Sequence, residues 1–140
     1  MTNFGDVGQF NHKFGLPSVI HDGGPRQVDL NSEEVQERLT LKMKHLSEEL
    51  REWEEGYYQD DVVKMADALV DLVYVALGTA HFLGLPWEQI WNEVHRANMR
   101  KVRATSPEES SRASASDVIK PPGFVPPDLE EILERFGWEF

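Results

Sequence analysis

The feature that most constrains this fold is a long apolar segment, residues 62–83, which carries two aspartates. Apolar residues occupy nearly every side of the helix that this segment predicts, a pattern typical of a helix at the centre of a protein. Asp67 and Asp71 are four residues apart and therefore share one face of that helix. Burying unpaired carboxylates is costly, so the two aspartates require cations, either Arg or Lys side chains or divalent metal ions.

A second long helix is predicted before this segment. Asn31 is a good N-cap, Glu34 follows three residues later as in a capping box, and the helix ends near Tyr58. Asp60 or Asp61 caps the helix over residues 62–83. The apolar stripe of the first long helix, with spacings of three and four, consists of Val35, Leu39, Met43, Leu46, Leu50 and Trp53.

Shorter helices complete an all-α pattern. Residues 3–14 favour a short helix, Pro86 opens a helix that continues to about Val102, and Asp128 caps a last helix over residues 128–136. Residues 104–117, rich in Ser and Glu, indicate a flexible loop, and Val118–Ile119 is too short to carry a sheet. The 140 residues therefore predict one domain, 1–140, a bundle of about four helices.

Composition excludes several classes of function. A formal net charge of −11 argues against a nucleic-acid backbone as partner, because phosphate binding needs clustered Lys and Arg. The chain contains no cysteine, which rules out disulfides and thiol nucleophiles. The apolar segment contains acids and lacks basic flanks, and no secretory signal precedes it, so we expect a cytoplasmic protein without a membrane partner.

Acidic residues gather on the first long helix as well. Glu48, Glu49 and Glu52 fall on one flank of its apolar stripe, with Glu49 nearest to the stripe. The short link at residues 56–60 predicts antiparallel packing, which turns five carboxylates toward one cleft. Oxygen ligands in this number suit Mg²⁺ or Mn²⁺ rather than zinc. The alternative is a set of buried salt bridges to Arg51, Lys64, Arg96 or Arg100.

The third long helix adds candidate phosphate ligands. Asn98 and Lys101 are one turn apart and follow the line of Ile90 and Val94, so they point inward and suggest phosphate contacts. The alternative is a snorkelling lysine and an asparagine at a helix end.

The ordered motifs resemble the all-α nucleoside triphosphate pyrophosphohydrolases, which include MazG proteins, dimeric dUTPases and phosphoribosyl-ATP pyrophosphohydrolase. Glu48-Glu49-x-x-Glu52 is followed after 14 residues by Asp67-x-x-x-Asp71. One departure is Ala68, which stands where the family usually has Glu. Further matching segments, the last similar to tails of small bacterial and phage MazG-like proteins, are Phe10 to Pro17, Asp71 to Gly78, Glu93 to Lys101 and Lys120 to Asp128.

The resemblance implies a MazG-like oligomeric bundle, a homodimer or homotetramer, in bacteria or phage-infected cells. It implies hydrolysis of a (d)NTP such as dGTP or dUTP to monophosphate and pyrophosphate, with two or three Mg²⁺ or Mn²⁺ ions. The ligands would be Glu49, Glu52, Asp67 and Asp71, with Glu48 as the catalytic outer carboxylate that positions or deprotonates a water. Rival hypotheses are phosphoribosyl-ATP pyrophosphohydrolase and a non-catalytic acidic helical module. The implied substrate-binding residues are Asn98, Lys101, Lys120, Tyr74 and Phe14.

Overall fold

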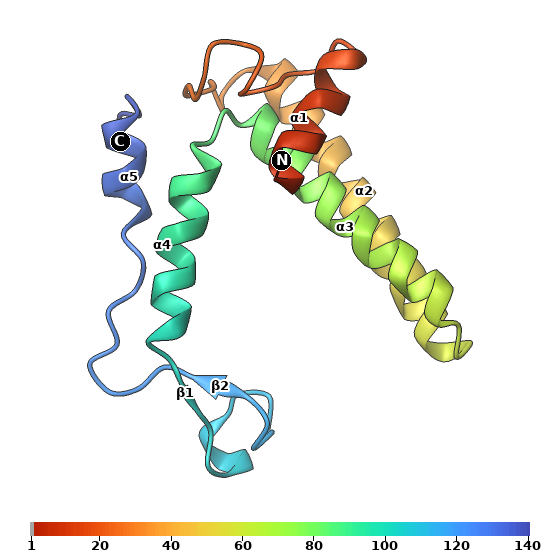
Figure 1. Ribbon diagram of the computed structural model, residues 1–140, viewed down its shortest axis with the longest axis vertical. Helices are drawn as coiled ribbons and strands as arrows, with labels where there is room; N and C mark the ends of the chain where they lie inside the picture. The colour runs from red at the N-terminus through yellow and green to blue at the C-terminus, as the bar shows by residue number, and fades with distance from the viewer. Residues whose placement is uncertain (1) are drawn as a thin grey trace. The chain divides into compact units, whose positions relative to one another are not determined.

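The computed structural model describes residues 2–140. Across these residues the chain is mostly helical, with five α-helices, one 3₁₀ turn and a pair of two-residue strands, which confirms the predicted all-α class (Figure 1). Contacts divide the chain into two compact units. The first contains residues up to Pro86 together with Phe136–Phe140, and the second contains Trp87–Arg135. The sequence predicted one domain. That prediction depends on how the two units are arranged relative to each other, so it stays a prediction.

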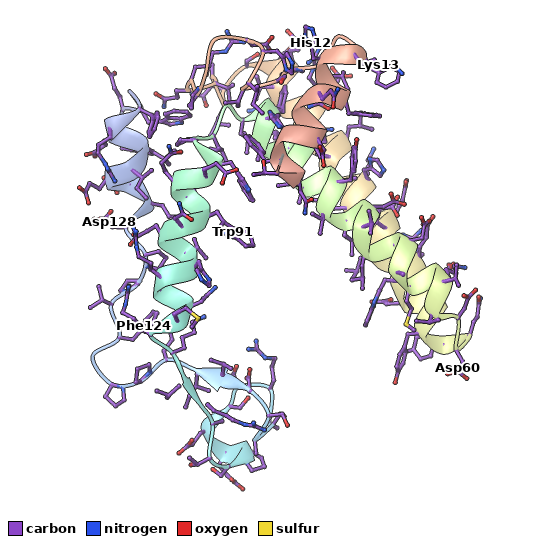
Figure 2. All side chains as sticks on the ribbon, viewed as in Figure 1. His12, Lys13, Asp60, Trp91, Phe124 and Asp128 are labelled. Atoms are coloured by element: carbon purple, nitrogen blue, oxygen red, sulfur yellow. The ribbon has the colours of Figure 1, made fainter. Side chains whose placement is uncertain are left out.

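An antiparallel helical hairpin dominates the first unit. Helix α2 (Glu33–Tyr58) and helix α3 (Val62–Phe82) lie side by side, joined by a short turn that carries Asp60 (Figures 1 and 2). Asp61 caps α3 as predicted, because its side chain accepts a hydrogen bond of 3.0 Å from the Lys64 amide. The predicted start of α2 was one residue too early, since Ser32 is the N-cap.

A buried histidine ties the N-terminal helix to α3. Helix α1 (Asn3–Lys13) places the Phe4 ring 3.8 Å from the ring of His81, stacked on it. The Val19 amide donates to His81 Nδ1 at 3.0 Å, so the proton lies on Nε2, which donates to the Phe4 carbonyl at 2.8 Å. Burial lowers the pKa of His81 and keeps the ring neutral. The C-terminal half of α3 is thereby covered by α1 and the following loop.

Helix α3 is less enclosed than its composition predicted. Ala68, Val75 and Leu77 are buried, but several valines and leucines of the same helix face outward. The prediction that α3 is buried on nearly all sides is wrong for the single chain, because only α2 and α1 make extensive contacts with it in the first unit. The exposed apolar residues of α3 are Val62, Val63, Leu69, Val70 and Val73.

The second unit contains helix α4 (Trp87–Met99) and helix α5 (Leu129–Arg135), which contact each other. The Glu93 carboxylate links the two segments, because it accepts from the Asp128 amide at 3.3 Å. Asp128 in turn accepts from the Glu131 amide at 3.1 Å, so it caps α5 as predicted. Helix α4 ends before the predicted Val102, since that residue enters a strand.

Residues 104–117 connect two very short strands. Strand β1 (Val102–Arg103) pairs antiparallel with strand β2 (Val118–Ile119), with Val102 opposite Ile119. A 3₁₀ turn, η1 (Pro107–Glu109), lies in the connection. Asp117 accepts hydrogen bonds from Ser110 and from the Arg112 guanidinium. These contacts hold the pKa of Asp117 at about 2, chiefly through Arg112 and then Ser110.

Candidate metal centre

The face that α2 turns toward α3 is partly charged. Seven residues of α2 are not exposed, and they alternate at spacings of four and three, as expected for one face of a helix. The predicted stripe was wrong at two positions: Met43 is 60% exposed and Leu50 is 49% exposed. Lys42 and Glu49, one residue earlier in each case, take their places. We call the contact between the two helices the α2–α3 seam; its α2 residues are Val35, Leu39, Lys42, Leu46, Glu49, Trp53 and Gly56.

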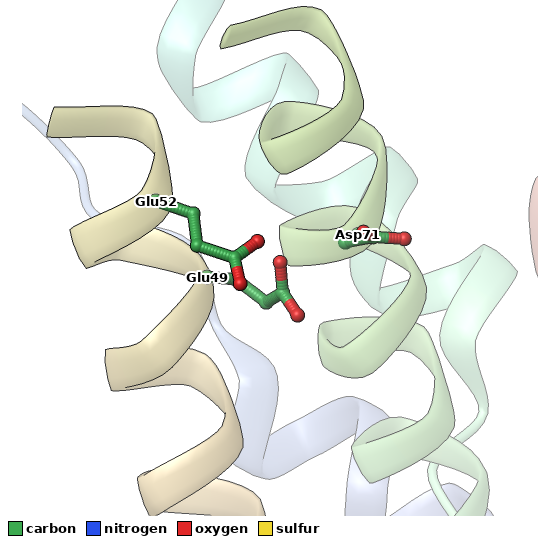
Figure 3. Close-up of side chains that lie close together, drawn as sticks. All are labelled: Glu49, Glu52 and Asp71. Carbon is green, nitrogen blue, oxygen red and sulfur yellow. The ribbon is translucent and has the colours of Figure 1, made fainter. Parts of the chain in front are cut away.

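Three carboxylates meet at this seam. Glu49 and Glu52 lie one turn apart on α2, and Asp71 lies on the neighbouring helix α3 (Figure 3). One oxygen from each residue lies within 4.8 Å of the oxygens from the other two. Glu49 is buried, with 8% of its surface exposed, whereas Asp71 is half-buried and Glu52 is exposed. The site is therefore open on the side of Glu52.

The electrostatics of this group are unfavourable for the protein alone. Burial raises the pKa of Glu49, and repulsion by Glu52 and Asp71 raises it further. Glu49 Oε2 is buried and has no hydrogen-bond partner among the described residues. A hydrogen bond between the carboxyl groups of Glu52 and Glu49 requires that one of the two is protonated. The nearest basic group is His45, whose Nε2 lies 3.5 Å from Glu49 Oε1 on a half-exposed ring.

These residues fit a divalent cation. Mg²⁺ binds oxygen ligands at roughly 2.0–2.1 Å and Ca²⁺ at roughly 2.3–2.6 Å, so ligands of a common ion lie within a few ångströms of one another. The three carboxylates satisfy this spacing, and a cation would give Glu49 Oε2 the partner that it lacks. Within residues 2–86 no ion pair to Arg or Lys includes Asp71, and Lys64 pairs instead with Glu55 at 3.0 Å. A divalent ion explains the cluster better than the salt-bridge alternative.

Two of the five predicted acids stand apart from this group. Glu48 and Asp67 are both exposed, and neither belongs to the set of three close carboxylates. Ala68, between Asp67 and Asp71 on α3, is 1% exposed and contributes only a methyl group. The roles of Glu48 as the carboxylate that activates water and of Asp67 as a metal ligand stay predictions.

Tyr74 of α3 belongs to an aromatic cluster with two phenylalanines of the N-terminal segment. Tyr74 follows Asp71 by three residues and is half-buried, with the Phe10 ring edge-on at 5.2 Å. Phe14 packs on Phe10 at 4.7 Å and is 57% exposed. The two predicted substrate-binding aromatics, Tyr74 and Phe14, thus belong to one cluster linked by Phe10. An exposed ring in such a cluster offers a face for stacking.

The remaining predicted substrate ligands belong to the second unit. Asn98 is exposed at the end of α4, and Lys101 is half-buried just after it. The Lys120 ammonium lies 5.8 Å from the centre of the Phe124 ring. Their contacts with substrate stay predictions. Sequence reasoning missed Lys42 and His45, although the heptad spacing of the α2 seam passes through Lys42.

The fold and this site define a class: an all-α hydrolase whose acids come from an antiparallel helix pair. The chain matches the family model of phosphoribosyl-ATP pyrophosphohydrolase over residues 24–98, just over half of its length. It therefore belongs to this family, within the MazG-like all-α pyrophosphohydrolases, and it is an enzyme rather than a non-catalytic helical module. No curated protein sequence matches the chain. Among the described residues no helix is long and apolar enough to cross a membrane.

Proposed function

We propose that the protein hydrolyses a nucleoside triphosphate to a monophosphate and pyrophosphate, using Mg²⁺ or Mn²⁺ held by Glu49, Glu52 and Asp71. The supporting observation is the buried, unpartnered oxygen of Glu49 among two further carboxylates. A bound divalent ion supplies charge neutralisation for the phosphates and lowers the pKa of water. The proposed site of action is the nucleotide pool of a bacterial or phage-infected cytoplasm.

The protein side chains have separable tasks in this proposal. Glu49, Glu52 and Asp71 hold the cation, and Asp67 adds a ligand from the preceding turn of α3. Glu48, exposed and one residue before Glu49, accepts a proton from the water that attacks the α-phosphorus. Tyr74 and Phe14 contact the base, while Asn98, Lys101 and Lys120 contact sugar and phosphates. The bond that breaks joins the α-phosphorus to the oxygen that leaves with pyrophosphate.

Phosphoribosyl-ATP is a second candidate substrate. The family match favours it directly, since the matched model bears this activity in its description. Both candidates contain the same triphosphate and release the same product, so the carboxylate site alone does not separate them. The separation depends on what the protein holds beyond the phosphates.

A substrate panel tests the proposal. We expect Mg²⁺- or Mn²⁺-dependent release of monophosphate and pyrophosphate from at least one (d)NTP, with dGTP and dUTP as the leading candidates. The measurement is chromatographic separation of products with and without EDTA, with phosphoribosyl-ATP in a parallel reaction. If the protein hydrolysed phosphoribosyl-ATP and none of the (d)NTPs, phosphoribosyl-ATP would be its substrate. Release of orthophosphate in place of pyrophosphate would contradict both.

We also propose that the protein works as a homodimer or homotetramer. Helices α2 and α3 both turn apolar residues to solvent, including Leu41 at 65% exposure and Val70 at 62%. Exposed apolar patches on a protein surface are typical of sites that a partner covers. A second copy is the partner that places two such faces together.

Light scattering checks this proposal. We expect a mass two or four times the chain mass of 16.1 kDa, and a shift toward the monomer in Val70→Glu. Leu30→Glu is the matched control, because Leu30 is similarly exposed at 57% but lies outside both helices. A wild-type protein with the mass of one chain at micromolar concentration would contradict the proposal.

A further inference from the structure

Besides Glu49, the face of α2 that lines the α2–α3 seam contains one more charged residue, Lys42. It is half-buried and lies two turns before Glu49 on the same face of α2. Its ammonium reaches across the seam to α3: Nζ lies 3.7 Å from the point where a Cβ would project from Gly78. A long side chain at position 78 would fill the space beside this ammonium. Glycine there keeps the flank of α3 open next to the lysine.

Lys42 has no partner for its charge. Among residues 2–140 neither a hydrogen bond nor an ion pair involves its ammonium, and burial lowers its pKa. A lysine kept in a seam for stability would be expected beside a carboxylate. The carboxylates of this seam are instead gathered with one another around Glu49. Among the described residues the seam therefore holds an unpaired ammonium and, separately, a group of carboxylates with no Arg or Lys partner.

The spacing between the lysine position and the carboxylate position is the same along both helices. Lys42 precedes Glu49 by seven residues on α2, and Gly78 follows Asp71 by seven residues on α3. Two helical turns correspond to roughly 10 Å along the axis. A ligand that carries a divalent cation at one end and anionic groups beyond it complements this arrangement. A metal-bound polyphosphate is such a ligand, and the flexible four-carbon stem of lysine lets the ammonium follow it.

We propose that Lys42 binds the outer phosphates of the substrate, those that leave as pyrophosphate. This assignment rests on the proposed function, because it requires a polyphosphate anchored at Glu49, Glu52 and Asp71. The ammonium forms charge-assisted hydrogen bonds to the phosphate oxygens and offsets the negative charge that the leaving group acquires. Lys42 is then a phosphate contact that comes from the same helical hairpin as the three carboxylates.

The test measures binding of inorganic pyrophosphate by calorimetry in the presence of Mg²⁺, without turnover. We expect Lys42→Met to weaken pyrophosphate binding by about 10- to 100-fold, the loss of one or two hydrogen bonds to a charged group. Lys44→Met is the matched control. Lys44 is exposed two residues further on, roughly 200° around the helix, so its replacement removes the same charge and leaves binding unchanged.

Stability measurements separate a ligand contact from a structural role. Without ligand, Lys42→Met should unfold at the same or a higher urea concentration than the wild type, because an unpaired ammonium leaves the seam. A lower unfolding midpoint would assign Lys42 a structural role and overturn the inference. Wild-type pyrophosphate affinity in Lys42→Met would also overturn it, as would an equal loss in Lys44→Met. If wild-type protein neither bound nor released pyrophosphate, the proposed function itself would fail.

Discussion

Replacing Glu49 by glutamine is expected to abolish most pyrophosphate release and, at the same time, to make the metal-free protein more stable. The two effects have opposite signs because the same carboxylate is needed by the ion and is unfavourable without it. Glutamine has nearly the same size and keeps one oxygen, so packing at the α2–α3 seam is preserved.

The loss of activity follows from the charge at the centre of the site. Glu49 is the most buried of the three close carboxylates and the one with an unpartnered oxygen. A bound ion contributes several kcal/mol to stabilising charge in the transition state, and each 1.36 kcal/mol corresponds to a factor of ten in rate. We therefore expect Glu49→Gln to lower the rate by about 10³-fold or more, measured as pyrophosphate released per enzyme at saturating Mg²⁺ or Mn²⁺.

The gain in stability follows from the raised pKa of Glu49. Because burial and the neighbouring acids raise its pKa in the folded protein, the folded state resists ionisation that the unfolded chain undergoes freely. The free energy of unfolding is therefore lowered as pH rises from the ordinary glutamate pKa of 4.5 through the raised pKa. Glutamine removes this penalty, so in EDTA the variant should exceed wild type at pH 7 and converge with it below about pH 4.

Divalent ions should reverse the order of stability. A ligand that binds only the folded state raises the melting temperature, so Mn²⁺ should stabilise wild type and leave Glu49→Gln nearly unchanged. Glu54→Gln is the control, since Glu54 is an exposed acid of α2 outside the close carboxylates. It should retain activity and the response to Mn²⁺. Near-wild-type turnover in Glu49→Gln would remove Glu49 from the site.

The sequence predicted which acids lie close together better than it predicted the residues around them. Glu49, Glu52 and Asp71 were found because helical spacing and a short link bring acids of two helices together, and both features are local. Lys42 was missed because the stripe was chosen by apolarity, which selected Met43 and Leu50 at neighbouring positions. The observed seam face of α2 contains two charged residues, Lys42 and Glu49. A search for regular helical spacing that ignored residue type would have included Lys42 in the buried face.

Contacts between distant segments account for the other differences. The pairing of Val102–Arg103 with Val118–Ile119 depends on a connection whose shape no local pattern shows. Helix α3 has the apolar composition of a buried helix, yet no described segment of the first unit covers its exposed valines. His81 gave no signal of its role, because its partners, Phe4 and Val19, are more than 60 residues away. Helix existence is a local property, whereas burial depends on tertiary contacts.

Gly84→Ala is expected to destabilise the first unit more than any of the substitutions proposed above. Gly84 ends α3 with a φ of +69°, a conformation that costs alanine about 1–2 kcal/mol. A Cβ at this position would lie 1.9 Å from the carbonyl oxygen of Arg26, which is backbone and cannot rotate away. The loop would have to move, which breaks the 2.9 Å hydrogen bond from the Arg26 amide to the Gly84 carbonyl.

Gly15→Ala separates the two causes, because Gly15 has the same φ of +69° but an added Cβ would meet no atom within 4 Å. It should lose only the conformational part, about 1–2 kcal/mol, whereas Gly84→Ala should lose about 3–4 kcal/mol once the clash and the hydrogen bond are included. Urea unfolding followed by circular dichroism gives both free energies. Since native domains are stable by only about 5–15 kcal/mol, the difference between the variants is measurable. Equal losses in the two variants would mean that the loop at Arg26 does not pack against the end of α3.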